Sequence, residues 1–383
     1  MLFVLALEPL LLAIKKSHDI SGIKIRETEI RAAAFADDMT CFVSNVESAG
    51  ALFALLNIFR SCSGLKINKE KSEGAWLGKW RNKKESMFGV KWPTSPIKIV
   101  GIHFSYDKRD NYARDVNKAV SNMKMIFNSW KRRKLSLFGK VLIIKTFGIS
   151  QFSYILNSIT LKKQTIQEVH KIMYEFLWEG KDKIARSTMM GGVGQGGLAM
   201  PNLYIMKKQQ RILWIKHYLD PDFNHPWKLF LDKQLEPVGG EMIFRCNYNT
   251  KVLPVKLSEF VTETLDIWAQ EIKVYKQGKD QIIWNNEKIL IGGKSVYMED
   301  FVRNGIMKVS DLFDANGLIP WQSIAQEEFT LIHKLRWLGL ASAIPGDLKY
   351  GEADLESTYF KITGIPMDLE TLTKKAIKNE LCE

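Results

Sequence analysis

The sequence predicts an α+β fold, in which an antiparallel sheet with packing helices is followed by a mostly helical region and a mixed carboxyl-terminal region. Two short apolar runs of strand-like composition flank the pair Asp37-Asp38, a pattern typical of a β-hairpin with the pair at its tip. Between Asn111 and about Ser158, apolar residues recur at mixed spacings of three and four, which predicts helices. Beyond Asp220 the expected elements are short and mixed.

The first fourteen residues, MLFVLALEPLLLAI, predict a helix buried in the core. They lack a basic leader and carry Glu8 and Pro9 within the apolar run, unlike a secretory signal. They are also shorter than the roughly 20 residues that a membrane-spanning helix needs. We therefore expect no membrane partner and an intracellular protein, nuclear or cytoplasmic, that is not secreted.

The adjacent carboxylates of Asp37 and Asp38 are the first candidate site. Two neighbouring anions repel each other, and a fold tolerates them where cations or hydrogen bonds offset the repulsion. Taken alone, such a pair is more often a solvated turn or a helix cap. At the tip of a hairpin, however, the pair could hold Mg²⁺. Two such ions, about 3.5 to 4 Å apart, activate an attacking hydroxyl and stabilise a leaving pyrophosphate.

The segments after this hairpin predict a helix and further strands. Ser44 and Glu47 have the spacing of a capping box, and the apolar positions that follow indicate a helix that ends at Gly64. Residues 65–78 are expected to return as a loop and strand, and residues 97–107 as another strand. We expect none of the helix residues to take part in chemistry.

A basic face accompanies the predicted helices between residues 111 and 158. Its aromatic neighbours are Trp130, Phe138 and Phe147, and the combination suits a sugar-phosphate backbone. The alternative is a solvated helix face with the aromatic rings in the core. The sequence KRRK within it is also compatible with a nuclear localisation signal. The candidate nucleic-acid-binding residues are Lys118, Lys124, Lys131, Arg132, Arg133, Lys134, Lys140 and Lys145.

Two further helices are expected at residues 165–178 and 203–218, joined by a glycine-rich loop at residues 191–197. The loop is not a P-loop, because Pro201 and no Lys-Ser/Thr pair follows the glycines. It is interpreted as a tight connection with positive backbone angles. The prolines and glycines from Pro226 to Pro254 suggest a linker.

Composition favours a polyanionic partner and a reducing compartment. The chain has 383 residues, with 55 Lys and Arg against 42 Asp and Glu, which gives a net charge of +13. Such an excess favours nucleic acid over an acidic lipid surface. The cysteines, which include Cys41, Cys246 and an isolated Cys382, are too few and scattered for a disulfide framework. Neither they nor the dispersed histidines form a zinc ligand set.

An ordered series of motifs resembles the reverse transcriptase of LINE-type (non-LTR) retrotransposons. The series consists of FADD, SGLKINKEKSEGAWLG, SWKRRKLSLFGKVLIIK and EFLWEGKDKIARSTMMGGVGQGGLAMPNL. In that family these motifs belong to the end of the polymerase palm and to the thumb. The resemblance continues through QIIWNNEKILIGGKSVYMEDFVRNGIMKVSDLFDANG and SAIPGDLK, so that it covers nearly the whole chain.

The resemblance implies three regions: a partial palm at 1–107, a helical thumb-like region at 108–220 and a post-thumb region at 221–383. It implies that Asp37 and Asp38 bind catalytic Mg²⁺. It places Lys71 near the departing pyrophosphate, as a general acid or a neutralising charge. The alternative for Lys71 is a surface lysine in a polar turn.

The resemblance also implies an RNA template, a DNA primer and, once the palm is complete, deoxynucleotide substrates. The fingers and the first metal-binding aspartate of the family have no counterpart in these 383 residues. We therefore expect the chain alone to be an inactive fragment of an RNA-directed DNA polymerase. The alternatives are a noncatalytic nucleic-acid-binding remnant and a decayed element product.

Overall fold

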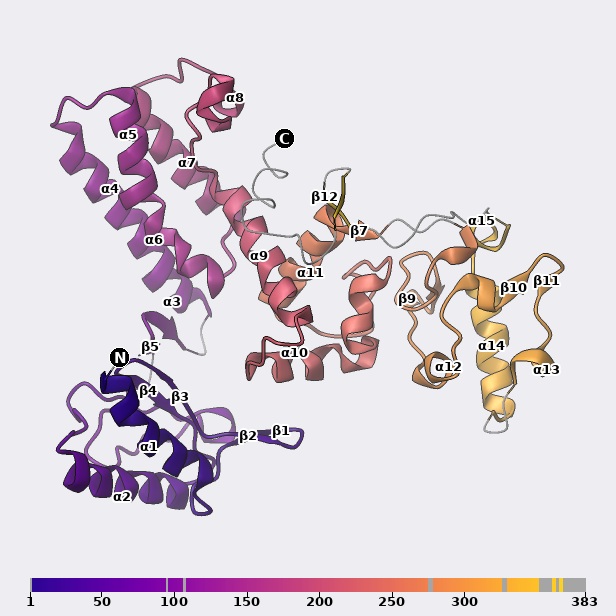
Figure 1. The fold of residues 1–383 in the computed structure, drawn as a ribbon, viewed down its shortest axis with the longest axis horizontal. Coiled ribbons are helices and arrows are strands. Elements are labelled where there is room, and N and C mark those ends of the chain that lie inside the picture. Colours follow the sequence, from indigo (N-terminus) through magenta and orange to yellow (C-terminus); the bar gives the residue numbers. More distant parts are fainter. Residues whose placement is uncertain are drawn as a thin grey trace. The chain divides into compact units, whose positions relative to one another are not determined.

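The computed structural model describes residues 2–93, 96–105, 108–274, 278–325, 329–350, 360–362 and 365–367. These residues divide into two compact units, residues 1–129 and 130–383. Each unit combines helices with small antiparallel sheets, which confirms the α+β class (Figure 1). The three regions expected from the resemblance stay a prediction, and two of the expected positions, Asp107 and Cys382, lie outside the described residues.

The first unit begins with helix α1 (Leu2–Lys16) and ends within helix α4 (Lys118–Lys131). Its strands form separate hairpins and not one continuous sheet. The elements between these helices are β1 (Ile23–Ile25), β2 (Thr28–Ile30), β3 (Ala32–Phe35), β4 (Asp38–Cys41), α2 (Val46–Ser63), η1 (Gly78–Trp80), β5 (Ile97–Ile99), β6 (Ile102–Phe104), α3 (Lys108–Tyr112) and the π-helical η2 (Ala113–Asn117).

Helix α1 buries only part of its apolar surface. Leu10 and Ile14 enter a small core with Ile20 and Leu52, because α1 packs against α2 and β3 along one side. Leu2 at the amino-terminal end is 85% exposed. The expectation of a helix buried throughout is therefore wrong for the amino-terminal half of α1.

Helix α2 begins one residue later than the capping-box pattern predicts. The N-cap is Asn45, whose side-chain oxygen accepts a hydrogen bond from the Ser48 amide at 2.7 Å. Ser44 and Glu47 therefore form no capping box, since the carboxamide of Asn45 takes that role. The expected end is confirmed, because Gly64 adopts the left-handed conformation, with φ of 76°.

The strands expected after α2 differ from those observed. Residues 74–77 are irregular, because the pairing there is a single bridge between Glu73 and Lys91. Residues 97–104 form a hairpin, β5–β6, in place of one strand. Val100 and Gly101 have consecutive positive φ angles of 44° and 86°, the backbone of a tight hairpin turn that reverses the chain.

The second unit is mainly helical, as expected for its first part. Helix α7 (Lys163–Trp178) and helix α9 (Leu203–Leu219) begin and end within two residues of the expected bounds. The other elements up to residue 219 are α5 (Leu137–Ile143), the π-helical η3 (Ile144–Gly148), α6 (Ser150–Ser153), η4 (Ile155–Asn157), α8 (Arg186–Met190) and η5 (Val193–Gln195).

The glycine-rich loop is a tight connection, as predicted. Gly196 has a φ of 80°, and a Cβ atom on Gly197 would lie 2.1 Å from the carbonyl oxygen of Gly191. The loop is closed by amide hydrogen bonds from Leu198 and Met200 to the Met189 carbonyl, at 3.2 and 2.9 Å. The glycines therefore allow two stretches of backbone to approach more closely than a residue with a Cβ atom would permit.

The segment expected to be a linker is a folded part of the second unit. Helix α10 (Trp227–Leu235) follows Pro226 and contributes Leu231 and Leu235 to a core shared with α9 and α11 (Glu259–Glu271). Val238, Ile243 and Phe244 enter the same core from η6 (Glu236–Val238) and η7 (Gly240–Arg245). The linker interpretation is wrong, because the prolines and glycines lie within or at the ends of short helices that belong to a packed core.

A third apolar core centres on Trp284, Phe301 and Leu340, which are fully buried. The elements beyond α11 are short, as expected. They are β7 (Lys273–Val274), η8 (Gly278–Asp280), β8 (Leu290–Ile291), β9 (Lys294–Ser295), α12 (Glu299–Arg303), η9 (Val309–Asp311), β10 (Phe313–Asp314), β11 (Gly317–Leu318), α13 (Trp321–Ile324), α14 (Leu331–Ala343), α15 (Gly346–Tyr350), β12 (Phe360–Ile362) and β13 (Ile365–Met367).

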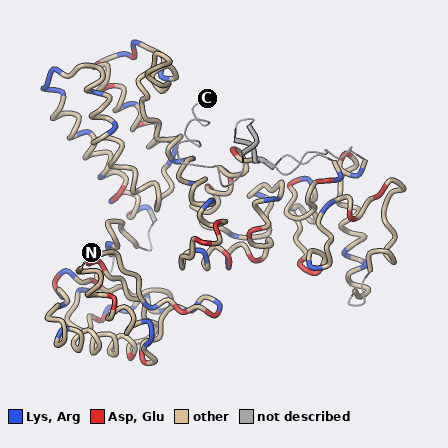
Figure 2. The backbone as a smooth tube through the Cα atoms, in the orientation of Figure 1, with Lys and Arg blue, Asp and Glu red and all other residues tan. Residues whose placement is uncertain are grey.

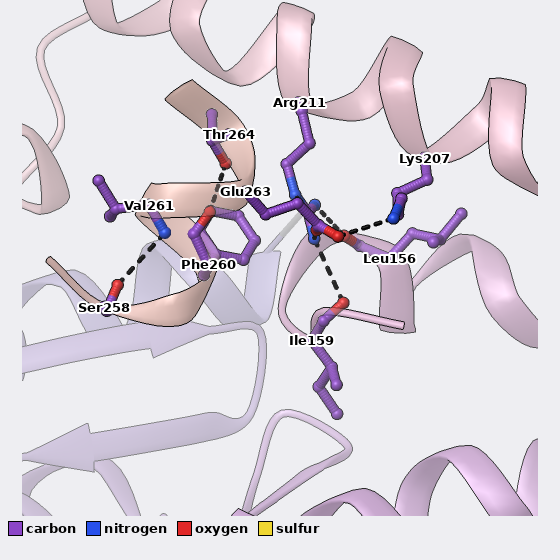
Figure 3. Close-up of polar contacts among 9 residues, drawn as sticks. All are labelled: Leu156, Ile159, Lys207, Arg211, Ser258, Phe260, Val261, Glu263 and Thr264. Atoms are coloured by element: carbon purple, nitrogen blue, oxygen red, sulfur yellow. Dashed lines mark hydrogen bonds and ion pairs between the residues drawn. The ribbon is translucent and has the colours of Figure 1, made fainter. Parts of the chain in front are cut away.

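A buried ion-pair network joins α9 to α11 and to the segment formed by η4 and the residues just after it (Figure 3). Arg211 is 1% exposed, and its guanidinium donates to Glu263 Oε2 at 3.0 and 3.1 Å and to the carbonyl oxygens of Leu156 and Ile159. Lys207 Nζ lies 2.7 Å from the second oxygen of Glu263. The buried charge of Arg211 is paired with acceptors from both neighbouring elements. Moving either element would leave donors of Arg211 unpaired, so the network fixes their placement relative to α9.

Candidate functional site

The Asp37-Asp38 pair lies at the tip of the β3–β4 hairpin, as the sequence predicts. The two strands pair in antiparallel register from Ala32 opposite Cys41 to Phe35 opposite Asp38. Only Ala36 and Asp37 remain for the turn, so that Asp37 occupies the turn and Asp38 opens β4. Both aspartates are exposed.

The two faces of this hairpin differ in what they contact. Ala32, Met39 and Cys41 pack against the core formed by α1 and α2. Since side chains alternate along a strand, Phe35 and Asp38 lie on the opposite face. Phe35 is 70% exposed there. The helices therefore cover one face of the hairpin and leave the carboxylate of Asp38 on the open face.

Ala36 holds the turn in a conformation that L-residues rarely adopt. Its φ angle is 53°, which places it in the left-handed region. This conformation costs about 1–2 kcal/mol for a residue with a Cβ atom. Such local strain recurs at functional sites, and here it projects Asp37 from a two-residue turn.

The chemistry of the two carboxylates at the hairpin tip is of the kind that could coordinate a divalent metal. Carboxylate oxygens are the donors that Mg²⁺ prefers, and Asp37 and Asp38 are exposed and adjacent. No group of three or more His, Cys, Asp or Glu side chains that could hold a metal occurs among the residues that the structure describes. The donors present therefore fit a partial site that needs a further ligand.

Lys71 lies in the turn that follows α2. Its backbone amide donates to the carbonyl oxygen and to the side-chain oxygen of Asn68, both at 3.2 Å. This hydrogen bonding identifies Asn68 as a turn former, as its position suggests. Within the described part of the chain, no hydrogen bond or ion pair joins the exposed Lys71 side chain to Asp37 or Asp38.

The basic candidates in the first unit lie on α4. Lys118 and Lys124 are exposed, whereas Val120, Met123 and Phe127 on the other side of the helix are buried. The helix is therefore amphipathic, as the spacing predicts.

In the second unit, the four residues Lys131, Arg132, Arg133 and Lys134 are all exposed and form a dense basic segment that starts at the last residue of α4 and ends before α5 (Figure 2). The Arg133 guanidinium lies 4.3 Å from the centroid of the Trp130 ring, which in turn stacks on Phe147 at 6.1 Å. An arginine that lies over an aromatic ring is held by it and can still donate hydrogen bonds to other partners.

Lys140 and Lys145 already have partners within the protein. Lys140 forms an ion pair with Glu179, just past α7, and its side chain is 14% exposed. This pairing lowers the pKa of the Glu179 carboxyl, chiefly through the hydrogen bond from Lys140. Lys145 Nζ donates to the Leu198 carbonyl at 3.3 Å. Both lysines therefore contribute to internal structure, whereas the 131–134 segment is open to solvent.

Burial shapes the chemistry of Cys41, Cys246 and His170. Burial raises the pKa of the Cys41 thiol to about 11 and that of Cys246 to about 12. Both therefore stay protonated and unreactive. His170 Nε2 accepts a hydrogen bond from the Leu203 amide at 3.0 Å, and burial lowers the pKa of its imidazole. His170 is a structural link between α7 and α9.

A cluster of tryptophans lies where the sequence pattern predicts a strand at Trp76. Trp76, Trp80 and Trp92 come together in the irregular segment between α2 and β5. A signal was present in the sequence, because tryptophans and lysines alternate closely in AWLGKWRNKK. The rings that stack are, however, 16 residues apart along the chain, and no periodicity reports such a contact.

No protein-family model matches the chain. Over 298 residues, or 72% of the chain, it is 22% identical to the transposon TX1 uncharacterized 149 kDa protein of Xenopus laevis. The matched stretch spans 22% of the length of that protein. The motif series predicts that the chain originates from a transposable element, and this similarity supports that origin. The name of the relative states no activity.

None of the helices in the described residues combines the length and the apolar character that crossing a bilayer requires.

Proposed function

We propose that the chain is part of the RNA-directed DNA polymerase of a non-LTR retrotransposon, with Asp37 and Asp38 at its catalytic centre. The β3–β4 hairpin is the observation that carries this proposal. Its tight turn presents two adjacent carboxylates, and the helices of the unit pack on the opposite face. A polymerase palm needs this arrangement, because the open face must accept nucleic acid.

The order of the motifs and the similarity to a transposon protein support the same proposal. The four motifs follow one another in the order of the resembling family. The distant relative is itself a transposon protein and matches most of the chain. A lone FADD sequence would carry far less weight than this ordered series.

Magnesium is the proposed cofactor, and Asp37 and Asp38 are the residues that would hold it. Bound Mg²⁺ would supply activation of a primer hydroxyl and stabilisation of the leaving pyrophosphate. Lys71 is proposed to neutralise charge on the departing group. The proposed partners are an RNA template and a DNA primer, with deoxynucleotides as substrates of the completed palm.

The chain alone is proposed to be inactive. A two-metal site draws a further carboxylate from another strand, and the described residues bring no third acidic group to the hairpin. This observation favours, as a second candidate, a noncatalytic nucleic-acid-binding remnant or a decayed element product. In that case the exposed 131–134 segment would be the functional feature.

Primer extension distinguishes these candidates. The purified chain, with an RNA template, a DNA primer, deoxynucleotides and Mg²⁺, is expected to give no product. The same chain preceded by the fingers and first palm motif of a related element is expected to extend the primer. Extension by the chain alone would refute the proposal that its active site is incomplete. If the longer protein folds but does not extend the primer, the noncatalytic candidate is favoured.

A further inference from the structure

Three tryptophan rings form a cluster in the first unit that the polymerase chemistry does not use. Trp76 stacks on Trp92 with centroids 4.5 Å apart and an angle of 25° between the planes. Trp80, in η1, lies against Trp76 at 6.2 Å with a tilt of 41°. The segment between α2 and β5 has little regular backbone pairing, so that ring contacts contribute much of its order.

Two of the three rings are fixed by hydrogen bonds. The indole nitrogen of Trp76 donates to the Glu85 carbonyl at 3.1 Å, and that of Trp92 donates to the Met87 carbonyl at 3.0 Å. Gly74 packs directly against Trp92, where an added Cβ atom would lie 2.7 Å from the ring. Trp76 and Trp92 therefore form a rigid base.

Trp80 is the exposed ring of the cluster. It is 36% exposed, and within the described residues its indole nitrogen makes no hydrogen bond. The ammonium groups of Lys79 and Lys83 lie 5.3 and 5.4 Å from its centroid. Lys83 is also 4.8 Å from the Trp76 centroid and forms an ion pair with Glu85 at 2.9 Å, so that its position is fixed. Lys79 is exposed.

The surrounding segment is strongly basic. Arg81 and Lys84 are exposed beside the cluster, and Lys83 offsets the nearby charge of Glu85. The face of an indole ring attracts cations, and the same face can stack on a nucleobase. The combination of a supported exposed ring with flanking lysines is typical of a site for unpaired nucleic acid.

We propose that Trp80 and Lys79 form a binding site for an unpaired nucleic-acid strand. A base stacks on the Trp80 ring while the Lys79 ammonium moves from the ring to the adjoining phosphate. Trp76, Trp92 and Lys83 hold the ring in place. This site deepens the proposed function and rests on it for the class of partner, a nucleic acid.

Fluorescence anisotropy with labelled 20-nucleotide oligomers tests the site on the full 383-residue chain. The probes are single-stranded RNA, single-stranded DNA and a DNA duplex. Trp80→Ala is expected to weaken binding of at least one single strand by about tenfold or more and to leave duplex affinity within about twofold. Trp80→Phe should retain most of the affinity. Lys79→Ala should reduce the log-log salt slope by about 0.7.

Tyr350→Ala is the matched control, since Tyr350 is an exposed aromatic residue of the second unit, at the end of α15. Circular dichroism must show that each variant keeps its fold. Unchanged affinity of Trp80→Ala for both single strands, or an equal loss for duplex, overturns the site. With either of these two results, the proposed function stands as long as the wild-type chain binds nucleic acid. A wild-type chain that binds none of the probes overturns both.

Discussion

Phe35 and Asp38 are directly paired across the β3–β4 hairpin and share the face that α1 and α2 leave open. A carboxylate next to a largely exposed phenyl ring brings no gain in burial to the fold. The pair is therefore expected to contribute little to the stability of the fold. The same reasoning applies to Ala36, which tolerates an unfavourable φ angle to form the turn.

Replacing Ala36 by glycine is expected to stabilise the first unit by about 0.5–1 kcal/mol, because glycine adopts a positive φ without steric cost. The free energy of unfolding in urea measures the effect. Ala33→Gly, in the middle of β3, is the control and should be destabilising, since glycine weakens a strand. Equal destabilisation by both changes would contradict the strain assigned to Ala36.

Replacing Arg211 by methionine is expected to destabilise the second unit by about 3–5 kcal/mol, because the carbonyls of Leu156 and Ile159 lose their donor and Glu263 keeps only Lys207 as a charged partner. Arg303→Met removes an exposed pair with Glu299 and should change stability by less than about 1 kcal/mol. Chemical denaturation of both variants provides the comparison. Similar losses in the two would show that the α9–α11 network contributes no more than a surface pair.

His170 is expected to make stability depend on pH below neutrality. Burial lowers the pKa of its imidazole in the folded state from the ordinary value of 6.5. As the pH falls below about 6.5, the unfolded chain binds a proton that the folded chain does not, and the free energy of unfolding decreases. The decrease continues until the pH reaches the lowered pKa, with a slope of at most about 1.4 kcal/mol per pH unit.

His170→Gln should flatten this dependence between pH 7.5 and 5, measured as urea unfolding at each pH. His18→Gln, at an exposed position in the first unit, is the control. An unchanged pH profile in His170→Gln would remove His170 as the cause.

Neutralising Lys131, Arg132, Arg133 and Lys134 together is expected to weaken nucleic-acid binding similarly across sequences. These residues would contact phosphates, so that the log-log salt slope should fall by roughly 0.7 per lost contact on single strands. Binding titrations at several salt concentrations measure both effects.

The matched control neutralises four exposed lysines elsewhere in the second unit, namely Lys233, Lys251, Lys256 and Lys294. It changes the net charge equally. If both variants lose the same affinity, binding depends on total charge, and the 131–134 segment has no special role.

Local signals in the sequence predicted much of the fold. The hairpin follows from two apolar runs around Asp37-Asp38, and α7 and α9 follow from apolar spacing, because these patterns lie within one element. The N-cap was misplaced by one residue because Ser44 and Asn45 are both competent caps, and the choice between them depends on backbone geometry.

Contacts between distant residues could not be predicted in this way. The stack of Trp76 on Trp92 and the ion pair of Arg211 with Glu263 join positions 16 and 52 residues apart, without periodicity to report them. The segment from Pro226 to Pro254 was misread as a linker for the same reason. Its prolines and glycines are visible in the sequence, whereas its burial depends on α9 and α11.

Primer extension by the Asp37→Ala variant of the chain joined to the fingers and first palm motif of a related element tests the proposed catalytic role of Asp37 most directly. Metal ions contribute several kcal/mol of transition-state stabilisation, so that loss of this ligand should reduce extension by about 1000-fold or more. Template binding should stay within about twofold, because a carboxylate has no attraction for the phosphates of the template. Extension at the wild-type rate by Asp37→Ala would place the catalytic metal site elsewhere and would contradict the central claim.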